Sequence, residues 1–513
     1  MALRNAGRWG VGAVGAGVAA LATWDLLQKK HTILRRYPVV GHLRYLMEDI
    51  RPELQQYFIE RDWDGRPYSR DTRALIYERA KGVDEEKPYG TELDVNRIGH
   101  EHLVHSTTPL EAPLEAPDEP SRVMVGGPDC SRPYSMALLN VSAMSFGALS
   151  ANAIRALNKG AALGGFAHDT GEGGLSPYHL EHGGDIVWEI GTGYFGARTD
   201  DGDFDPEMFR ETASKDQVKT VSLKLSQGAK PGVGGVLPGA KVTQEIADTR
   251  RVPVGVKCVS PPSHKVFSTP TELIEFVARM RELAGGKPAG FKLCVGSRVD
   301  VLAICKAITE VGTAPDFIIV DGSEGGTGAA PLEFEDHVGM SLTEGLMTVH
   351  NALVGAGLRD TIRIGASGKV AGAGDLVKRL TQGADYTNAA RAMMMAAGCI
   401  QAQRCHTDKC PSGVATQNAR RARALDVEDK SERVHRYQRA TVDEAMRLMA
   451  AMGVRDPAEL TPAHLRRNES TTETRSYAEI YEWLAPGELL DQPPSTWARD
   501  WALASPDHFG GAR

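Results

Sequence analysis

The clearest indication of the fold is FIIVDGSEGGTGAAP, residues 317–331. It begins with a continuous apolar run, Phe317–Asp321, and continues into a loop rich in glycine. A strand that is buried on both faces has a nearly continuous apolar sequence, and parallel strands are usually buried on both faces. Glycine in the loop lets the backbone come close to a ligand. The stretch therefore predicts a buried parallel strand that ends at a ligand-binding loop.

The same unit, an apolar run followed by a helical pattern, recurs between residues 135 and 395. The other seven runs are Leu138–Ser145, Gly165–Thr170, Ile186–Ile190, Val221–Leu225, Gly290–Val295, Ile362–Ala366 and Tyr386–Ala390. Eight such units favour a closed barrel over the alternative, an open doubly wound sheet, because parallel strands need crossover connections. We predict an α/β fold, a (β/α)8 TIM-type barrel with an N-terminal helical or irregular extension and a C-terminal helical segment.

Glycine-rich loops follow six of the runs, at 142–150, 168–174, 191–196, 224–235, 321–331 and 365–370. In a barrel these loops converge on the carboxyl face, where active sites lie. So much bare backbone suits a large, flat, anionic cofactor, and phosphate sites of this fold usually follow the seventh and eighth strands. We therefore predict FMN. Lys292, on the fifth strand, would neutralise charge at the flavin N1–O2 edge; a strand-end ion pair is the alternative for this lysine.

Composition excludes several classes of protein. The net charge of −7 over 513 residues gives no electrostatic case for nucleic acid, so we expect no such partner. Seven cysteines are too few for a disulfide scaffold and favour a reducing compartment.

The amino terminus contains WGVGAVGAGVAALATW, residues 9–24, without a charge. A bilayer-spanning helix needs about 17 residues or more, and basic residues after the segment outnumber those before it. We predict a membrane anchor at 1–30 with the catalytic body in the cytoplasm; a buried helix of a cytoplasmic protein is the alternative. The rest divides into an extension and linker at 31–122, the barrel with a cysteine loop at 123–425 and a helical region at 426–513.

Three of the seven cysteines, Cys399, Cys405 and Cys410, lie in GCIQAQRCHTDKCPSGVATQ. Their C-x5-C-x4-C-P spacing favours an iron–sulfur cluster, and three thiolates suit a three-iron cluster. Zinc is the alternative, with His406 as a fourth ligand. Because the loop closely follows the predicted phosphate loop at 388–391, we expect a one-electron centre near the flavin.

These stretches resemble the FMN-binding synthase domain of the glutamate synthase family. The matching segments, over about 135–420, are SAMSFGALS, DTGEGG, KLSQGAKPGVGG, SPPSH, DGSEGGTGAAP and GCIQAQRCHTDKCPSGVATQ. The resemblance implies a TIM-type barrel with FMN and a [3Fe-4S] cluster. The implied reaction is reductive amination, in which 2-oxoglutarate and ammonia give 2-iminoglutarate and reduced FMN converts this imine to L-glutamate.

The resemblance also implies site residues. Cys399, Cys405 and Cys410 would hold the cluster, and Glu172 and Lys224 would line the substrate side as catalytic residues, Glu172 as the acid. The implied flavin contacts are Ala143, Met144, Ser145, Lys292, Gly325, Gly326, Gly365, Gly368 and Arg391.

Two departures from the family pattern bear on function. The chain begins Met-Ala-Leu without an amidotransferase cysteine, so we expect ammonia to arrive free or from a partner. The family's K-Q-x4-R-F-G segment appears here with Trp188, Glu189 and Tyr194, which removes two positive charges that could bind 2-oxoglutarate; Arg198 could compensate. Alternatives are another 2-oxo acid or an amine such as an N-alkylglutamate, and a membrane-held electron-transfer subunit. In each case we expect an external electron donor such as ferredoxin or a reductase subunit.

Overall fold

The computed structural model describes residues 2–83, 86–111 and 121–510, with side chains from residue 12 onward. The predicted extension and linker at 31–122 therefore lies partly outside the described residues. The chain forms two compact units, Met1–Thr72 and Arg73–Arg513.

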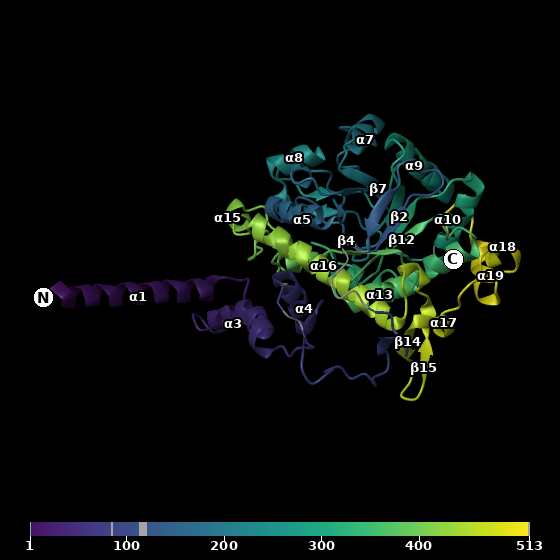
Figure 1. The fold of residues 1–513 in the computed structure, drawn as a ribbon. Helices are drawn as coiled ribbons and strands as arrows, with labels where there is room; N and C mark the ends of the chain where they lie inside the picture. The colour runs from purple at the N-terminus through teal and green to yellow at the C-terminus, as the bar shows by residue number, and fades with distance from the viewer. Residues whose placement is uncertain (1, 84–85, 112–120, 511–513) are drawn as a thin grey trace. The chain divides into compact units, whose positions relative to one another are not determined.

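The larger unit contains a closed barrel of eight parallel strands (Figure 1). In barrel order they are β4 (Leu139–Val141), β5 (His168–Asp169), β6 (Ile186–Ile190), β7 (Val218–Lys224), β10 (Ala289–Leu293), β11 (Phe317–Asp321), β12 (Arg363–Ser367) and β13 (Tyr386–Ala389). Each strand falls within or overlaps one of the eight apolar runs, so the predicted barrel is confirmed.

Helices follow the strands and surround the barrel. Around it lie α5 (Ala151–Gly164), α6 (Pro177–Leu180), α7 (Pro206–Ala213), α8 (Gln244–Arg250), α9 (Pro270–Leu283), α10 (Arg298–Val311), α11 (Leu332–His337), α12 (Leu342–Gly355), α13 (Ala373–Thr381) and α14 (Arg391–Ala396). Their ends follow local chemistry: Thr269 and Glu272 form a capping box at the start of α9, and Gly312, with φ 77°, ends α10.

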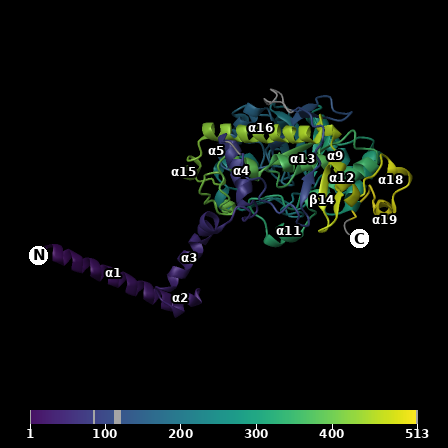
Figure 2. The same ribbon diagram turned by 60° about the horizontal axis from the view of Figure 1, so that its bottom comes forward.

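The carboxyl-terminal part is largely helical, and its long helix α16 (Val427–Met452) packs along α5 and α13 (Figures 1 and 2). The shorter helices of this part are α15 (Ala419–Ala422), α17 (Tyr477–Ile480), α18 (Glu488–Asp491) and α19 (Ser495–Leu503), whereas α4 (Arg70–Lys81) precedes the barrel in the chain. A small antiparallel sheet joins β1 (Glu101–Leu103), β14 (Leu465–Asn468) and β15 (Thr474–Ser476), and β8 (Val236–Leu237) pairs with β9 (Cys258–Val259).

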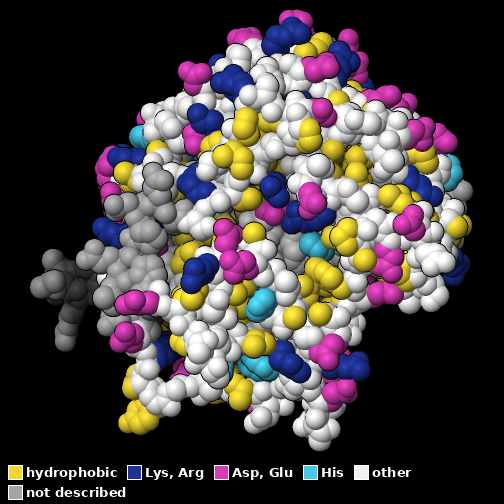
Figure 3. Space-filling model, turned by 45° about the vertical axis from the view of Figure 1, so that its right-hand side comes forward, with side chains coloured by type: hydrophobic (Ala, Val, Ile, Leu, Met, Phe, Trp, Pro, Cys, Tyr) yellow, Lys and Arg dark blue, Asp and Glu magenta, His cyan; other side chains and the backbone are white. Residues whose placement is uncertain are grey.

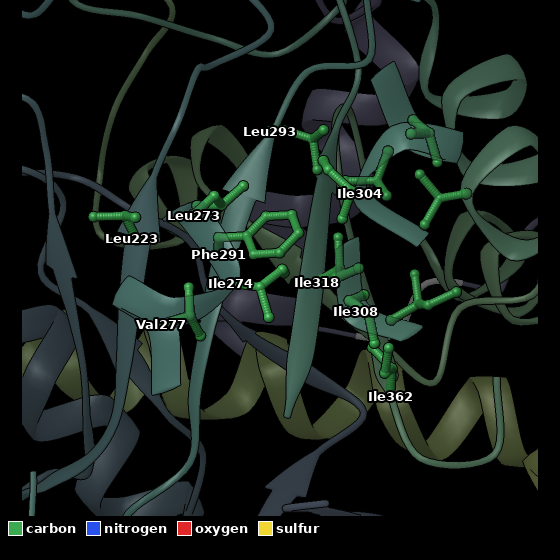
Figure 4. Packing of buried hydrophobic residues seen from close by; sticks show 14 of the residues in the cluster. Leu223, Leu273, Ile274, Val277, Phe291, Leu293, Ile304, Ile308, Ile318 and Ile362 are labelled. Carbon is green, nitrogen blue, oxygen red and sulfur yellow. The ribbon is translucent and has the colours of Figure 1, made fainter. Parts of the chain in front are cut away.

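The main hydrophobic core lies between the strands and the surrounding helices. In Figure 4, Phe291 of β10 and Ile318 of β11 project toward Ile274 of α9 and Ile304 of α10. All four side chains are buried, and this layer fixes the strands on which the site residues stand.

A second, smaller core fills the amino end of the barrel. The hairpin of β2 (Arg122–Val125) and β3 (Tyr134–Ala137) packs Val125 and Met136 against Phe317, Ile319 and Tyr386. This end of the barrel is therefore closed, and the charged side chains lie toward the other end.

The predicted membrane anchor is wrong. The segment does form a helix, α1 (Ala2–Leu27), but no helix in the described part of the chain is long and apolar enough to cross a membrane. The physical reason is composition, because glycine and alanine make up most of the uncharged stretch and each removes little apolar surface from water.

The rest of the smaller unit comprises α2 (Thr32–Arg36), α3 (Gly41–Leu54) and a π-helical turn at Gln55–Ile59. Asp25, near the end of α1, is fully buried within this unit. Its carboxylate accepts a hydrogen bond from the Val39 N–H at 2.8 Å and pairs with His42 at 2.9 Å. This contact ties the end of α1 to the start of α3.

On the face of the molecule in Figure 3, lysine and arginine side chains are interspersed with aspartate and glutamate. The mixture of signs matches the small net charge of the whole chain.

Candidate active site

The alternation of β6 decides which residues of the Trp188–Tyr194 segment reach the barrel interior. Trp188 points outward and stacks on Phe209 of α7, with ring centroids 5.0 Å apart. Glu189, the next residue, points to the opposite face because successive side chains of a strand alternate. Its carboxylate is fully buried beside two lysines.

Four charged side chains from neighbouring strands and one loop form the centre of the site. Lys292 Nζ on β10 lies 3.4 Å from Glu189 Oε2, and Lys224 Nζ on β7 lies 3.9 Å from Glu189 Oε1. Lys224 Nζ also lies 3.3 Å from Glu172 Oε1, in the loop after β5. The structure thus brings together the predicted residues Glu172, Lys224 and Lys292, and adds Glu189 between the two lysines.

Two aspartates that end their strands complete this charged layer. Burial and the nearby charge of Glu189 raise the pKa of Asp169 well above its usual value. Burial opposes the charge of Lys292, but Glu189, Asp321 and Asp169 together raise the pKa of this lysine. Neither aspartate was predicted as a site residue, although a carboxylate in the last position of an apolar strand is a usable signal.

The pKa of Glu172 is lowered, although burial alone would raise it. The opposing causes are the positive charges of Lys224, Lys230 and Arg250. Glu172 is therefore a carboxylate near neutral pH, surrounded by cations. The direction of this shift favours Glu172 as a hydrogen-bond acceptor, because an ionised carboxylate accepts hydrogen bonds, and its role as the acid stays a prediction.

A small pocket that is open to solvent lies beside this cluster. Its lining includes Glu172, Thr192, Lys224, Gln227, Val233 and Pro262. A few convergent polar groups in a pocket are typical of small-molecule sites. The lining therefore presents both charges of the Glu172–Lys224 pair to the pocket.

The loop after β4 lies against the glycine-rich loop after β5. A Cβ on Gly171 would lie 2.9 Å from the Ser145 nitrogen and 3.1 Å from the Met144 nitrogen, so only glycine fits there. Ser145 Oγ accepts a hydrogen bond from the buried Arg250 at 3.2 Å. Ala143, directly after β4, is half-buried.

The loops after β7 and β11 cross at Gly228 and Gly322, where a Cβ on Gly228 would lie 1.7 Å from the Gly322 oxygen. The Gly228 N–H donates to Asp321 Oδ2 at 2.8 Å, and the side chain of Gln227 donates to Thr327 at 3.3 Å. These contacts connect the substrate side to the loop at 321–331.

The other predicted flavin contacts only partly converge. A Cβ on Gly326 would lie 2.8 Å from Arg391 Nε, and Arg391 donates to the Glu324 oxygen at 2.5 Å. Gly325 lies beside the Asp321 carboxylate, and Gly368, with φ 142°, lies near the Gly322 nitrogen. Gly365 is apart from them, within β12, where a Cβ would meet the ring of Tyr386 at 2.7 Å.

The three clustered cysteines share one loop. Burial raises the pKa of Cys399 to about 12, and the charges of Cys405 and Cys410 add to the shift. Lys241, which is buried, donates to the Ala148 and Ala415 oxygens at 2.9 and 3.1 Å and so joins this loop to the loop after β4. Yet no three His, Cys, Asp or Glu side chains among the described residues are grouped so that they could hold a metal ion.

Tyr194 stabilises a neighbouring loop, and Arg198, which the sequence suggested as a compensating cation, contacts Phe195 and Gly193. The Tyr194 hydroxyl is buried and accepts hydrogen bonds from the backbone N–H groups of Lys265 and Val266, at 3.0 and 3.4 Å. Arg198 lies over the ring of Phe195 and donates to the Gly193 oxygen at 3.3 Å. The cations near Glu172 are instead Lys230 and Arg250, which the sequence prediction missed.

Comparison with known families gives the same assignment as the motifs. A family model described as a conserved region in glutamate synthase matches residues 114–455, about two thirds of the chain. The chain belongs to the glutamate synthase family. It is therefore a glutamate synthase-like oxidoreductase, and the resemblance seen in the sequence is confirmed.

Within this family, the chain is 38% identical over 477 residues to the glutamate synthase large subunit-like protein YerD of Bacillus subtilis, covering 86% of this chain and 90% of that protein. The archaeal-type glutamate synthase [NADPH] of Thermotoga neapolitana is 33% identical over 61% of this chain, which spans 59% of that relative. The archaeal glutamate synthase [NADPH] of Methanocaldococcus jannaschii is 34% identical, with 61% and 58% covered.

Among solved structures, a flavocytochrome b2 double mutant with pyruvate bound matches with a TM-score of 0.42 at 14% identity. The match covers 86% of this chain and 91% of that one. A likeness at this level supports no argument about function.

Proposed function

We propose that the protein is an FMN-dependent oxidoreductase that reduces a carbon–nitrogen double bond, with 2-iminoglutarate, formed from 2-oxoglutarate and ammonia, as substrate and L-glutamate as product. The observation that carries the proposal is the buried Glu172–Lys224 pair, 3.3 Å apart beside a pocket at the barrel mouth of a glutamate synthase family member. Paired buried charges in a pocket are typical of functional sites.

The cations around Glu172 are suited to a dicarboxylate substrate. Lys224, Lys230 and Arg250 all act on the Glu172 carboxylate, so positive charge is available without the two basic residues that the Trp188–Tyr194 segment lacks. In this proposal Lys224 binds a substrate carboxylate, and Glu172 accepts a hydrogen bond from the substrate nitrogen. The pair thereby orients the imine, and the surrounding loops exclude water.

The residues present fit a flavin. At Gly171 and Gly326 a Cβ would meet Ser145 or Arg391, so glycine lets the loops after β5 and β11 pack closely against these residues. A flat ligand at the barrel mouth would lie against loops that carry few side chains. Ala143, Met144 and Ser145 would contact the ring, with Lys292 at its anionic edge and Arg391 toward the phosphate. When bound, FMN supplies the hydride equivalent for the imine carbon.

We also propose an iron–sulfur cluster on Cys399, Cys405 and Cys410, as their spacing predicts. The thiols lie in one loop and influence one another's pKa, but the described residues do not form a metal site, so we derive no step through a cluster. For the electron donor we propose ferredoxin or an NADPH-linked reductase subunit, and for ammonia a free supply or a partner enzyme.

Anaerobic flavin reoxidation tests the reaction. Protein loaded with FMN and reduced chemically is mixed with 2-oxoglutarate and ammonium, and flavin absorbance is followed. We expect reoxidation that requires both compounds, slowed about a hundredfold by Lys224→Met. Lys265→Met, which removes an exposed lysine paired with Asp203, is the control and retains the rate. Reoxidation by other 2-oxo acids but not 2-oxoglutarate would reassign the substrate, and no reoxidation would refute imine reduction.

Iron and acid-labile sulfide analysis tests the cluster. We expect both in anaerobically purified protein and their loss in Cys405→Ser. Cys305→Ser, which alters a cysteine buried in α10, is the matched control and keeps its iron. Iron-free wild-type protein after anaerobic reconstitution would contradict the proposal.

A further inference from the structure

Glu189 is a buried carboxylate to which the proposed reaction gives no role. Its side chain has no exposed surface, and it comes from β6 into the layer of charges at the carboxyl end of the barrel. An ionised carboxylate in such a position is costly unless positive partners compensate for its lost hydration. Its partners therefore indicate what it does.

Those partners are the two lysines of the site. Glu189 Oε2 lies 3.4 Å from Lys292 Nζ, and Oε1 lies 3.9 Å from Lys224 Nζ. Lys292 and Lys224 are aligned in neighbouring strands, so Glu189 faces both at once. Within the described residues Oε1 accepts no hydrogen bond, which leaves part of the carboxylate unneutralised by a donor.

The pairing bears on flavin chemistry through Lys292. Uptake of two electrons and one proton leaves reduced flavin with a negative charge at its N1–O2 edge, which a nearby cation stabilises. A carboxylate beside that cation offsets its field, because opposite charges a few ångströms apart in a buried site interact strongly. The ion pair of Lys224 with Glu189 is the weaker of the two, because Lys224 also pairs with Glu172 and donates a hydrogen bond to Gln227.

We propose that Glu189 lowers the reduction potential of the flavin by offsetting the positive charge of Lys292. This rests on the proposed function only in requiring FMN in the barrel. Glu189 is a positioning and charge-setting residue that acts through Lys292, and it makes the bound flavin a stronger reductant than a neutral side chain would. Asp169 and Asp321 also face Lys292, so the effect of Glu189 is one part of a shared field.

The test compares full-length, FMN-loaded wild type with Glu189→Gln, which removes the charge and keeps the shape. The flavin midpoint potential is measured anaerobically against a reference dye. Sulfite affinity is measured in parallel, because the sulfite adduct at N5 places negative charge on the same edge. In Glu189→Gln we expect a more positive potential and sulfite binding about tenfold tighter or more. Glu207→Gln, an exposed glutamate on α7, is the matched control and leaves both unchanged.

A double variant keeps the inference testable if Glu189→Gln alone does not fold. Glu189→Gln/Lys292→Gln removes both partners and leaves no uncompensated member of the pair. If Glu189 offsets Lys292, the double variant has a potential near that of the wild type. A double variant with a far more negative potential than the wild type would show that Lys292 acts without being offset, and would overturn the inference.

The outcomes separate this inference from the proposed function. Wild type that binds FMN and reduces the imine, with a potential unchanged in Glu189→Gln, would refute the role of Glu189 alone. Wild type that binds no FMN would refute both. A shift toward positive potential in Glu189→Gln together with a wild-type-like double variant would support the inference, whatever the imine turns out to be.

Discussion

Tyr194 holds a loop at the barrel mouth with a single hydroxyl. It accepts the N–H groups of Lys265 and Val266, and its ring packs against His264 with centroids 5.5 Å apart. His264 in turn contacts the Lys224 oxygen at 2.8 Å through Nε2. Tyr194, which from the sequence seemed to have replaced a substrate contact, therefore supports the backbone of Lys224 through His264.

Tyr194→Phe should destabilise the protein without affecting the charges of the site. Removing the hydroxyl leaves two backbone N–H groups without their acceptor, a loss of about 1–3 kcal/mol in the free energy of unfolding. Urea unfolding measures this loss, and FMN titration should give an unchanged dissociation constant. A tenfold weaker FMN affinity at normal stability would place Tyr194 in the cofactor site after all.

The crossing of the loops after β7 and β11 depends on glycine at both positions. The Gly228 N–H is bonded to Asp321, and its α-carbon faces the carbonyl of Gly322. The substrate side of the mouth and the loop at 321–331 are therefore held together at this crossing.

Gly228→Ala should separate these loops. A methyl group there would lie 1.7 Å from a backbone oxygen, and we expect a loss of about 3 kcal/mol in the free energy of unfolding together with weaker FMN binding. Gly328→Ala is the matched control, because a Cβ at this exposed position in the same loop meets nothing within 4 Å. Equal stabilities of the two variants in urea would argue against the crossing.

Across the whole molecule, buried histidines make stability depend on pH. Burial lowers the pKa of His179 and His350 to about 3 and that of His264 to about 4. Between about pH 4 and 6.5 the unfolded chain binds protons at these positions while the folded chain does not. The free energy of unfolding therefore falls as pH falls through this window.

Burial also lowers the pKa of His168 well below its usual value, so four histidines contribute. The free energy of unfolding should change by about 1.4 kcal/mol per pH unit for each histidine, or about 5.5 kcal/mol per pH unit for the four together. Urea unfolding at several pH values between 4.5 and 7.5 measures this slope. His350→Gln should reduce the slope by about a quarter, even though it also removes a ring stacked on Trp483. A pH-independent free energy of unfolding over this range would contradict burial of the neutral rings.

The barrel could be predicted from the sequence because parallel strands are continuous apolar runs. The hairpin of β2 and β3 could not, since each strand has only four residues and its partners lie far along the chain. Lys224 and Glu172 could be predicted as candidates because they lie at the end of a strand and in the loop that follows one. The place of Glu189 between the two lysines could not, because a motif alone does not show which face of a strand each residue occupies. The prediction of a membrane anchor was wrong because the amino-terminal segment is uncharged like a membrane helix, but its many glycines and alanines give it too little apolar surface.

The closeness of Gly228 to Gly322 also limits how this protein can change by mutation. Every single-base change in a glycine codon either adds a side chain, ends the chain or is silent. At this crossing even the smallest side chain would meet a carbonyl oxygen. A substitution of Gly228 therefore requires a simultaneous rearrangement of the loop after β11, and one of Gly322 requires a shift of Leu342 at the start of α12, whereas the exposed Gly328 can vary alone.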